Sequence, residues 1–441
     1  MSIKTTTKNY NNALKPTQKA GGLAWALCLS GKDNFFMKLQ YRWIDEKDID
    51  FHSIFSDSIQ HVDFSSENKN KSLFENIMKK QTCIKEQNKL AQFFTPADVS
   101  LFTAYNLLKD FDCIKNCIFD PCIGYGSLLI SSGIVLATKY GLKNEELLNK
   151  LYGSEISESV YFNAINNIIN GLSEWINGID KELAIKILSD NIKNTDFLMT
   201  DIPKNSYIIA NPPYKEDKQS KYKNLWIPFM EKIVTSNNTD SFGVIIPVSI
   251  CSAKRTKNIR DIILKKFGLV LATHHEIRPR PLFKHIDQRI SIFIATKKKT
   301  LNKYNTTGFL TYKSGDRYKI WDIDTVELDY NLCSEVFPKV SKNDIDFYYY
   351  QQLYGFPIKN ISDGELIKIW VRTTGRYKLL AQYKRPDKIT SKWKEIEIPN
   401  KRAINIISAF NNGEAIRWWK IFGDGRDISL TNFMNNFKVL S

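Results

Sequence analysis

Short apolar runs alternate with longer segments of helical spacing through the middle of the chain, between residues 91 and 300. Each run is too short for a helix and is bounded by polar or turn-forming residues, which is typical of a buried strand. Strands and helices in alternation predict an α/β fold with a doubly wound, parallel-dominated sheet. Six strands are predicted in this way: Ile118–Phe119, Leu151–Gly153, Tyr207–Ala210, Phe242–Pro247, Leu269–Thr273 and Ile290–Ala295.

Two regions of different pattern flank this alternation, and a chain of 441 residues is long enough for two or three domains. Residues 1–90 begin with a polar stretch and then place apolar residues at helical spacing, which predicts a helical N-terminal extension. Residues 301–441 are rich in aromatic residues and return to a helical pattern from residue 403. The sequence therefore predicts three parts, 1–90, 91–300 and 301–441, with mixed secondary structure in the last.

One of the predicted strands ends in the tetrapeptide Asn211-Pro212-Pro213-Tyr214. Proline has no N–H donor and fixes its own backbone, so the strand stops and a stiff loop begins. The Asn211 side-chain oxygen and the Pro212 carbonyl are acceptors that could hold the amino group of a nucleobase. Tyr214 could stack on the base face. A proline-stiffened turn with a buried Asn is the structural alternative, and four residues alone do not decide between the two.

Three other segments carry residues suited to a nucleoside ligand. Glu155 ends the second strand, where doubly wound folds bind ribose hydroxyls, and Asp196 with Phe197 could bind an adenine ring. Asp190 lies between Glu155 and Asp196 in the sequence and is an alternative to Asp196. The first strand runs into a glycine-bearing turn that allows close backbone approach to a ligand: Asp120-Pro121-Cys122-Ile123-Gly124-Tyr125-Gly126.

In the order of these motifs, the chain resembles S-adenosylmethionine-dependent adenine-N6 DNA methyltransferases of the gamma motif order, such as the modification enzymes of restriction systems. The resemblance covers about residues 85–300. Within it, Gln92–Pro96 matches the leading motif, and Thr95-Pro96 would help to hold the methionine part of the cofactor. The resemblance implies a Rossmann-like methyltransferase sheet, catalysis by Asn211–Tyr214 on an adenine flipped out of duplex DNA, and a C-terminal DNA-recognition domain.

The charge of the chain favours a polyanionic partner. Lysine and arginine number 63 against 47 acids, a net charge of +16. Residues 371–402 hold ten basic and three acidic residues with aromatics between them. Positions 215–223 carry four lysines just after the tetrapeptide, and Phe283 is the candidate to support the flipped base from its other face. The basic candidates for DNA contact are Lys215, Lys221, Lys254, Arg255, Arg376, Lys384 and Arg385.

Other readings of the same motifs remain open. The tetrapeptide would also suit a methyltransferase acting on RNA or on a protein glutamine amide, and a methyltransferase-like subunit could bind DNA without activity. The seven cysteines are odd in number and scattered, which favours a reducing, cytoplasmic location and no metal. We also expect no membrane span. The expected binding partners are duplex DNA and, in restriction systems, a separate specificity or nuclease subunit.

Overall fold

The computed structural model describes residues 95–214, 224–283, 288–297, 303–313, 317–329, 336–374, 379–423 and 428–439. The predicted N-terminal extension, residues 1–90, and the motif residues Gln92–Phe94 lie outside the described residues. Three predicted DNA contacts, Lys215, Lys221 and Arg376, lie outside them as well. Within the described ranges, no helix is both long and apolar enough to cross a membrane.

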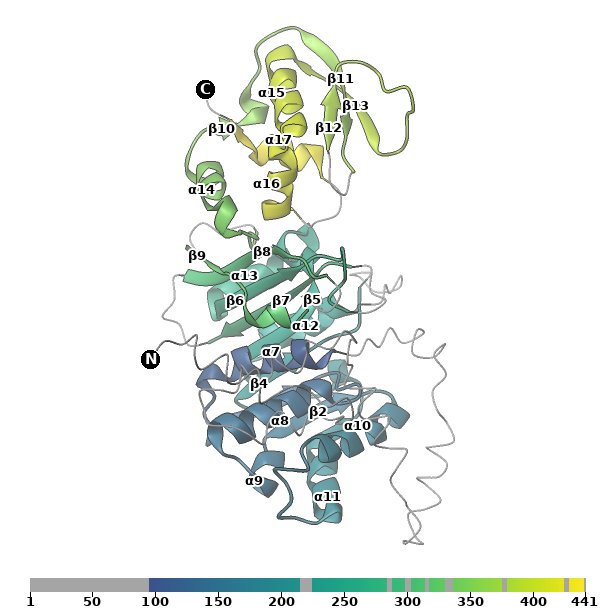
Figure 1. Ribbon diagram of the computed structural model, residues 1–441, viewed down its shortest axis with the longest axis vertical. Helices are drawn as coiled ribbons and strands as arrows, with labels where there is room; N and C mark the ends of the chain where they lie inside the picture. Colours follow the sequence, from purple (N-terminus) through teal and green to yellow (C-terminus); the bar gives the residue numbers. More distant parts are fainter. Residues whose placement is uncertain are drawn as a thin grey trace, which may run out of the picture.

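The centre of the molecule is a nine-stranded sheet with the strand order β3-β2-β1-β4-β5-β7-β6-β8-β9 (Figure 1). The first five strands in this order, β3, β2, β1, β4 and β5, run parallel to one another. Strand β7 is antiparallel to both of its neighbours. The predicted doubly wound α/β sheet is thus confirmed. Its strands are β1 (Cys117–Asp120), β2 (Leu151–Glu155), β3 (Ile192–Asn194), β4 (Ser206–Ala210), β5 (Thr239–Pro247), β6 (Gly268–His275), β7 (Ile290–Thr296), β8 (Lys303–Leu310) and β9 (Val326–Asp329).

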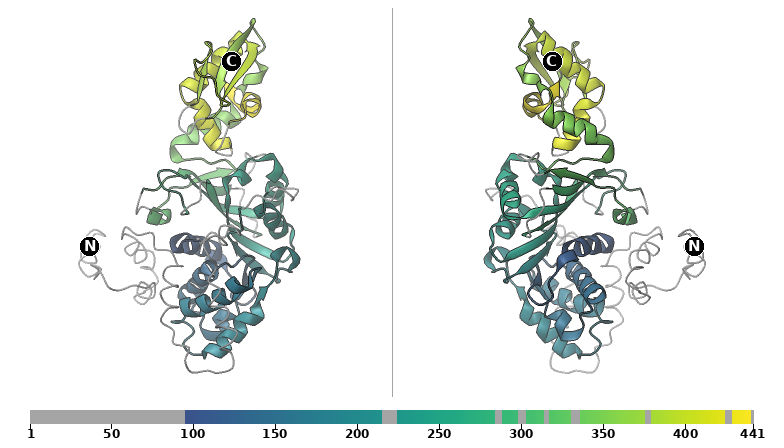
Figure 2. Two further views of the ribbon diagram at one scale, coloured as in Figure 1. Left: turned by 90° about the vertical axis from the view of Figure 1, so that its right-hand side faces the viewer. Right: turned by 90° about the vertical axis from the view of Figure 1, so that its left-hand side faces the viewer.

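Helices cover both faces of the sheet, which explains why its central strands read as continuous apolar runs. All five residues of β4 are buried, and eight of the nine residues of β5 are. Figure 2 shows α7 on one side of the strands and α12 with α13 on the other. The helices of this region are α7 (Ala97–Leu107), α8 (Ser127–Tyr140), α9 (Asn144–Leu148), α10 (Glu158–Gly171), α11 (Lys181–Asn191), α12 (Trp226–Thr235) and α13 (Lys257–Lys266).

The sheet does not end at the predicted domain boundary of residue 300. Strand β8 pairs in parallel with β6, and β9 pairs antiparallel with β8, so the sheet continues to Asp329. Between β8 and β9, a short 3-10 helix, η6 (Arg317–Trp321), packs beside α7. There the ring of Trp321 packs edge-on against Phe102, with ring centroids 5.6 Å apart. The boundary was misplaced because β8 is amphipathic and polar at its start, unlike the buried strands before it.

A second, smaller unit, here called the C-terminal module, spans Ile345–Val439 (Figure 1). Its antiparallel sheet has the order β12-β11-β13, and α15 packs on one face of it. This matches the mixed secondary structure predicted for the region. The elements are α14 (Ile345–Leu353), β10 (Phe356–Pro357), β11 (Leu366–Arg372), β12 (Leu380–Gln382), β13 (Trp393–Pro399), α15 (Asn400–Asn411), α16 (Glu414–Phe422), α17 (Leu430–Asn436) and β14 (Lys438–Val439).

Two cations join the large sheet to the C-terminal module. The Lys339 side chain is 1% exposed, and its ammonium donates to the carbonyls of Ile421 and Gly423 at the end of α16, at 3.0 and 2.7 Å. Arg289 donates to Glu276, and its guanidinium lies 5.6 Å from the ring centroid of Trp419 in α16. Cations at the C-terminal end of a helix are favoured by its exposed carbonyls. The module is therefore attached by buried polar contacts.

Candidate functional site

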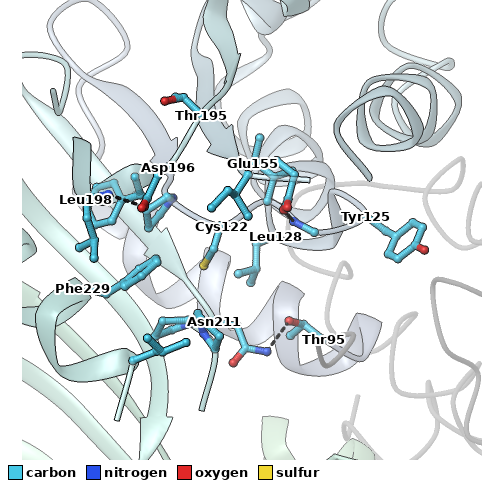
Figure 3. Close-up of a pocket in the computed structure, with 18 of the residues that line it drawn as sticks. Thr95, Cys122, Tyr125, Leu128, Glu155, Thr195, Asp196, Leu198, Asn211 and Phe229 are labelled. Carbon is cyan, nitrogen blue, oxygen red and sulfur yellow. Dashed lines mark hydrogen bonds between the residues drawn. The ribbon is translucent and has the colours of Figure 1, made fainter. Parts of the chain in front are cut away.

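The carboxyl ends of β1, β2 and β4 meet at one edge of the sheet and surround a cavity of about 280 Å³ (Figure 3). Ligands of doubly wound sheets bind at this edge. Ten residues of the predicted catalytic and cofactor sets line the cavity: Thr95, Pro121, Cys122, Gly124, Glu155, Asp196, Phe197, Asn211, Pro212 and Pro213. Residues from five separate stretches of sequence are thus brought together around one cavity.

The glycine-bearing turn follows β1 and forms one wall of the cavity. Gly124 has φ +56° and Gly126 has φ +91°, a backbone region that glycine adopts without steric cost. Gly126 directly precedes α8, and a Cβ there would meet Ile168 Cγ1 at 3.0 Å. Gly153 in β2 allows the turn to lie close, because a Cβ there would be 2.6 Å from the Asp120 carbonyl oxygen. Three predicted cofactor residues do not line the cavity: Pro96, Asp120 and Gly126.

Two buried carboxyl groups lie at the ends of β1 and β2, and one of them, Glu155, lines the cavity. The Gly124 N–H donates to Glu155 Oε2 at 3.0 Å, and Ser157 N–H donates to Oε1 at 2.9 Å. Burial raises the pKa of Glu155 above its usual range. Burial, together with the nearby Glu155 charge, also raises the pKa of Asp120 to about 7, although one oxygen accepts from the Cys122 N–H. The other oxygen, Asp120 Oδ2, is buried and has no hydrogen-bond partner among the described residues.

The Asp196 turn forms the opposite wall. Asp196 Oδ1 accepts from the Leu198 N–H at 2.9 Å and caps the 3-10 helix η3 (Phe197–Met199). Asp196 lines the cavity, whereas the alternative, Asp190, is exposed on α11. The structure therefore favours Asp196 as the acid facing a ligand. Phe197 is 2% exposed, and its ring centroid lies 5.1 Å from that of Phe229 on α12.

The tetrapeptide closes the cavity below these walls. The Asn211 amide nitrogen donates to Thr95 Oγ1 at 3.0 Å, as Figure 3 shows. The Tyr214 hydroxyl lies 2.6 Å from Asn211 Oδ1 and 2.9 Å from the Ile245 carbonyl oxygen. These contacts hold the amide of Asn211 between Thr95, which lies two residues before α7, and strand β5.

Two aromatic predictions differ from the arrangement seen. Tyr214 is 8% exposed and does not line the cavity, so its ring is not placed to stack on a base there. Its hydroxyl instead bonds the Asn211 side chain and the β5 backbone. Phe283 is 1% exposed and belongs to the hydrophobic core, so it offers no face to a base in this structure. Stacking by either ring stays a prediction that requires the ring to move.

Sequence reasoning missed some residues that line the cavity, among them Ile156 and Phe229. Ile156 carries a local signal, because it directly follows the acid at the end of β2 and is 65% exposed. Phe229 carries none, since it is one of several apolar residues on an amphipathic helix. Its place in the cavity depends on how α12 packs, which is a tertiary property.

The sheet order and the strand-end cavity define a methyltransferase-type doubly wound fold. Residues 69–252 match the family described as N-6 DNA Methylase, and the resemblance drawn from the motifs is thereby confirmed. The Type II methyltransferase M.BsuBI of Bacillus subtilis is similar, with 28% identity over 209 residues. The match covers 42% of this chain and 39% of that protein, so this chain corresponds to about two fifths of the relative's length.

Two solved structures from restriction systems are also similar. The M protein of the type I restriction enzyme EcoKI is 12% identical, with 88% of this chain and 87% of that chain covered and a TM-score of 0.39. The methyltransferase subunit of a type I restriction-modification system from Streptococcus thermophilus is 13% identical, with 52% of each chain covered and a TM-score of 0.37.

Proposed function

We propose that this chain is a site-specific DNA methyltransferase that transfers a methyl group from S-adenosylmethionine to the N6 atom of a flipped adenine. The observation that carries the proposal is the single cavity, which joins the glycine-bearing turn, two strand-end acids and the side chain of Asn211. A cofactor pocket alone would suit many transferases. An Asn-Pro-Pro segment in the same wall adds acceptors suited to an exocyclic amine.

The residues present fit this cofactor. S-Adenosylmethionine offers donors on its ribose, adenine and amino groups and carries positive charge on sulfur. Glu155 and Asp196 supply acceptors at two walls, and the orphaned Asp120 oxygen adds a buried carboxyl group behind the third. Ile156 and Phe229 supply apolar surface for a planar ring. The bound cofactor would supply an electrophilic methyl group.

Asn211 and Pro212 would prepare the nucleophile. The amine of adenine is weakly nucleophilic because its lone pair is delocalised into the ring. Hydrogen bonds from that amine to Asn211 Oδ1 and to the Pro212 carbonyl would favour a tetrahedral nitrogen with a localised lone pair. Thr95 fixes which end of the amide faces the cavity, because it accepts from the Asn211 nitrogen at 3.0 Å. Amide oxygens have two acceptor positions, so Oδ1 can bind a second donor beside Tyr214.

Basic side chains on two elements would contact the DNA backbone. Lys254 and Arg255 are exposed on η5 (Lys254–Thr256), which follows β5 beside the tetrapeptide strand. Lys384 and Arg385 are exposed on the connection between β12 and β13, and Arg385 lies 5.7 Å from the ring centroid of Trp370. Phosphate contacts of this kind set register and add salt-dependent affinity.

The cellular setting is part of the same proposal. We place the enzyme in the cytoplasm, in a restriction-modification or related defence system, as the resemblance of its motifs to the modification enzymes of restriction systems implies. A separate specificity or nuclease subunit would be its protein partner.

The decisive experiment compares wild type, Asn211→Ala and the control Asn166→Ala in a host without adenine methylation. Asn166 carries the same amide group but donates only to a carbonyl of its own helix. We expect wild type and Asn166→Ala to give modified adenines at one sequence context, detected at base resolution. Asn211→Ala should bind S-adenosylmethionine normally in calorimetry but lose about 10² to 10³-fold in kcat, as for loss of one positioned polar group.

Two results would overturn the proposal. One is full methylation by Asn211→Ala. The other is a wild-type enzyme that leaves duplex DNA unmodified but methylates RNA or a glutamine-containing peptide, which would support the alternative substrates.

A further inference from the structure

A single lysine on α12 holds the turn that carries Asp196. The Lys232 ammonium donates to the carbonyls of Phe197, Leu198 and Thr200, at 2.7, 2.9 and 2.6 Å. An ammonium has three N–H donors, so all three are used on this one turn. The same ammonium lies 4.9 Å from the ring centroid of Phe197.

The turn has few other means of fixing its shape. It is a single 3-10 turn, and its side-chain support comes from the Asp196 cap and from Thr200, whose hydroxyl donates to the Asp196 carbonyl at 2.8 Å. Short 3-10 segments have poorer hydrogen-bond geometry than α-helices. A cation that binds three of the carbonyls therefore has a large share in setting where the Asp196 carboxylate and the Phe197 ring lie.

Helix α12 also reaches the cavity directly. Phe229, one turn before Lys232, lines the cavity and packs on Phe197. Lys232 and Phe229 thus bind the Asp196 turn to the same face of α12, one through polar contacts and the other through ring packing.

We propose that Lys232 is a positioning residue that sets the affinity for the adenosine part of the cofactor by holding the Asp196 turn in place. The inference rests on the proposed function, because it takes the cavity as the cofactor site. It assigns a role to a residue that touches neither the cavity nor the tetrapeptide.

The chain contains a matched control for this role. The Lys266 ammonium on α13 also donates to three consecutive carbonyls, at 3.3 Å to Val234, 3.0 Å to Thr235 and at short range to Ser236. Its cation likewise lies near a phenylalanine ring, 5.6 Å from the centroid of Phe267. The carbonyls that it binds end α12, and none of these residues lines the cavity.

The test measures binding of S-adenosylmethionine and of adenosine by calorimetry, together with thermal unfolding, for wild type, Lys232→Met, Lys232→Arg and Lys266→Met. We expect Lys232→Met to bind both ligands at least about tenfold more weakly, as expected for loss of charge-assisted hydrogen bonds. Lys232→Arg should recover part of the loss. In turnover assays the effect should appear in KM for the cofactor, and kcat should change less.

The control separates positioning from general stability. Lys266→Met should lower the midpoint of thermal unfolding by about as much as Lys232→Met yet bind both ligands as wild type does. Equal loss of affinity in both methionine variants, or unchanged affinity in Lys232→Met, would overturn the inference alone. Failure of wild type to bind S-adenosylmethionine would overturn the proposed function, and the inference with it.

Discussion

His275 provides a test of the buried polar network at the end of β6. It is 1% exposed, and its ring nitrogens lie 2.9 Å from the hydroxyls of Tyr312 and Thr273. A neutral imidazole has one donor and one acceptor, and hydroxyl groups can complement both. Burial lowers the pKa of His275 from 6.5 to about 3, because the charged imidazolium form is poorly solvated there.

The direction and size of the pH effect follow from this pKa. Below pH 6.5 the unfolded chain binds a proton on His275, whereas the folded chain stays neutral down to about pH 3. The contribution of His275 to the free energy of unfolding is therefore fully present above pH 6.5 and decreases as the pH falls. The loss is about 1.4 kcal/mol per pH unit, so roughly 2 kcal/mol is lost between about pH 7.5 and about pH 5.

Asp120 acts in the opposite direction, so a difference measurement is needed. Its raised pKa of about 7 means that the folded carboxyl binds a proton on acidification before the unfolded one does. Stability from Asp120 is present at low pH and is lost as the pH rises through 7. Comparing wild type with His275→Gln cancels this contribution, because both proteins keep Asp120.

The assay is urea unfolding of both proteins at the two pH values. We expect His275→Gln to be less stable than wild type at neutral pH and the gap to shrink by about 2 kcal/mol at the acidic pH. A gap that stays constant within about 0.5 kcal/mol would refute the assignment of His275 as a buried neutral group.

Two further substitutions test the walls of the cavity. Gly153→Ala would place a Cβ 2.6 Å from the Asp120 carbonyl oxygen and 2.8 Å from Ile123 Cδ1, so we expect a loss of about 1–3 kcal/mol in urea unfolding, and an unchanged midpoint would contradict the close packing. Thr95→Val removes the oxygen that accepts from Asn211, so kcat at saturating cofactor should fall about tenfold, and wild-type kcat would show that the amide needs no such anchor.

The sequence predicted the sheet well because its central strands are buried on both faces and are therefore apolar throughout. All six predicted strands are present, as β1, β2, β4, β5, β6 and β7. Strand β3 was missed because only one of its three residues is buried. It lies at the sheet edge, where the hydrophobic pattern is weakest.

The site was predictable where a role depends on local sequence and was missed where it depends on distant partners. Asn211 follows a predicted strand and Glu155 ends another, so strand ends located both, whereas Asp196 was located by its place between them in the order of motifs. Arg260 lies close in sequence to the basic candidates Lys254 and Arg255, yet it is 3% exposed and donates to the Ile250 and Ala253 carbonyls. Lys232 is one of 63 basic residues, and only the folded chain shows which carbonyls it binds.

The attachment of the C-terminal module through Lys339 limits which modules this sheet could carry. A buried ammonium without partners costs several kcal/mol, so any unit grafted at this position would need to end a helix with open carbonyls against it. Arg289 adds a second requirement, a flat ring such as that of Trp419 at the same interface. Exchange of the C-terminal module between related chains would therefore succeed only when the new module also has both features, the open carbonyls at a helix end and the flat ring.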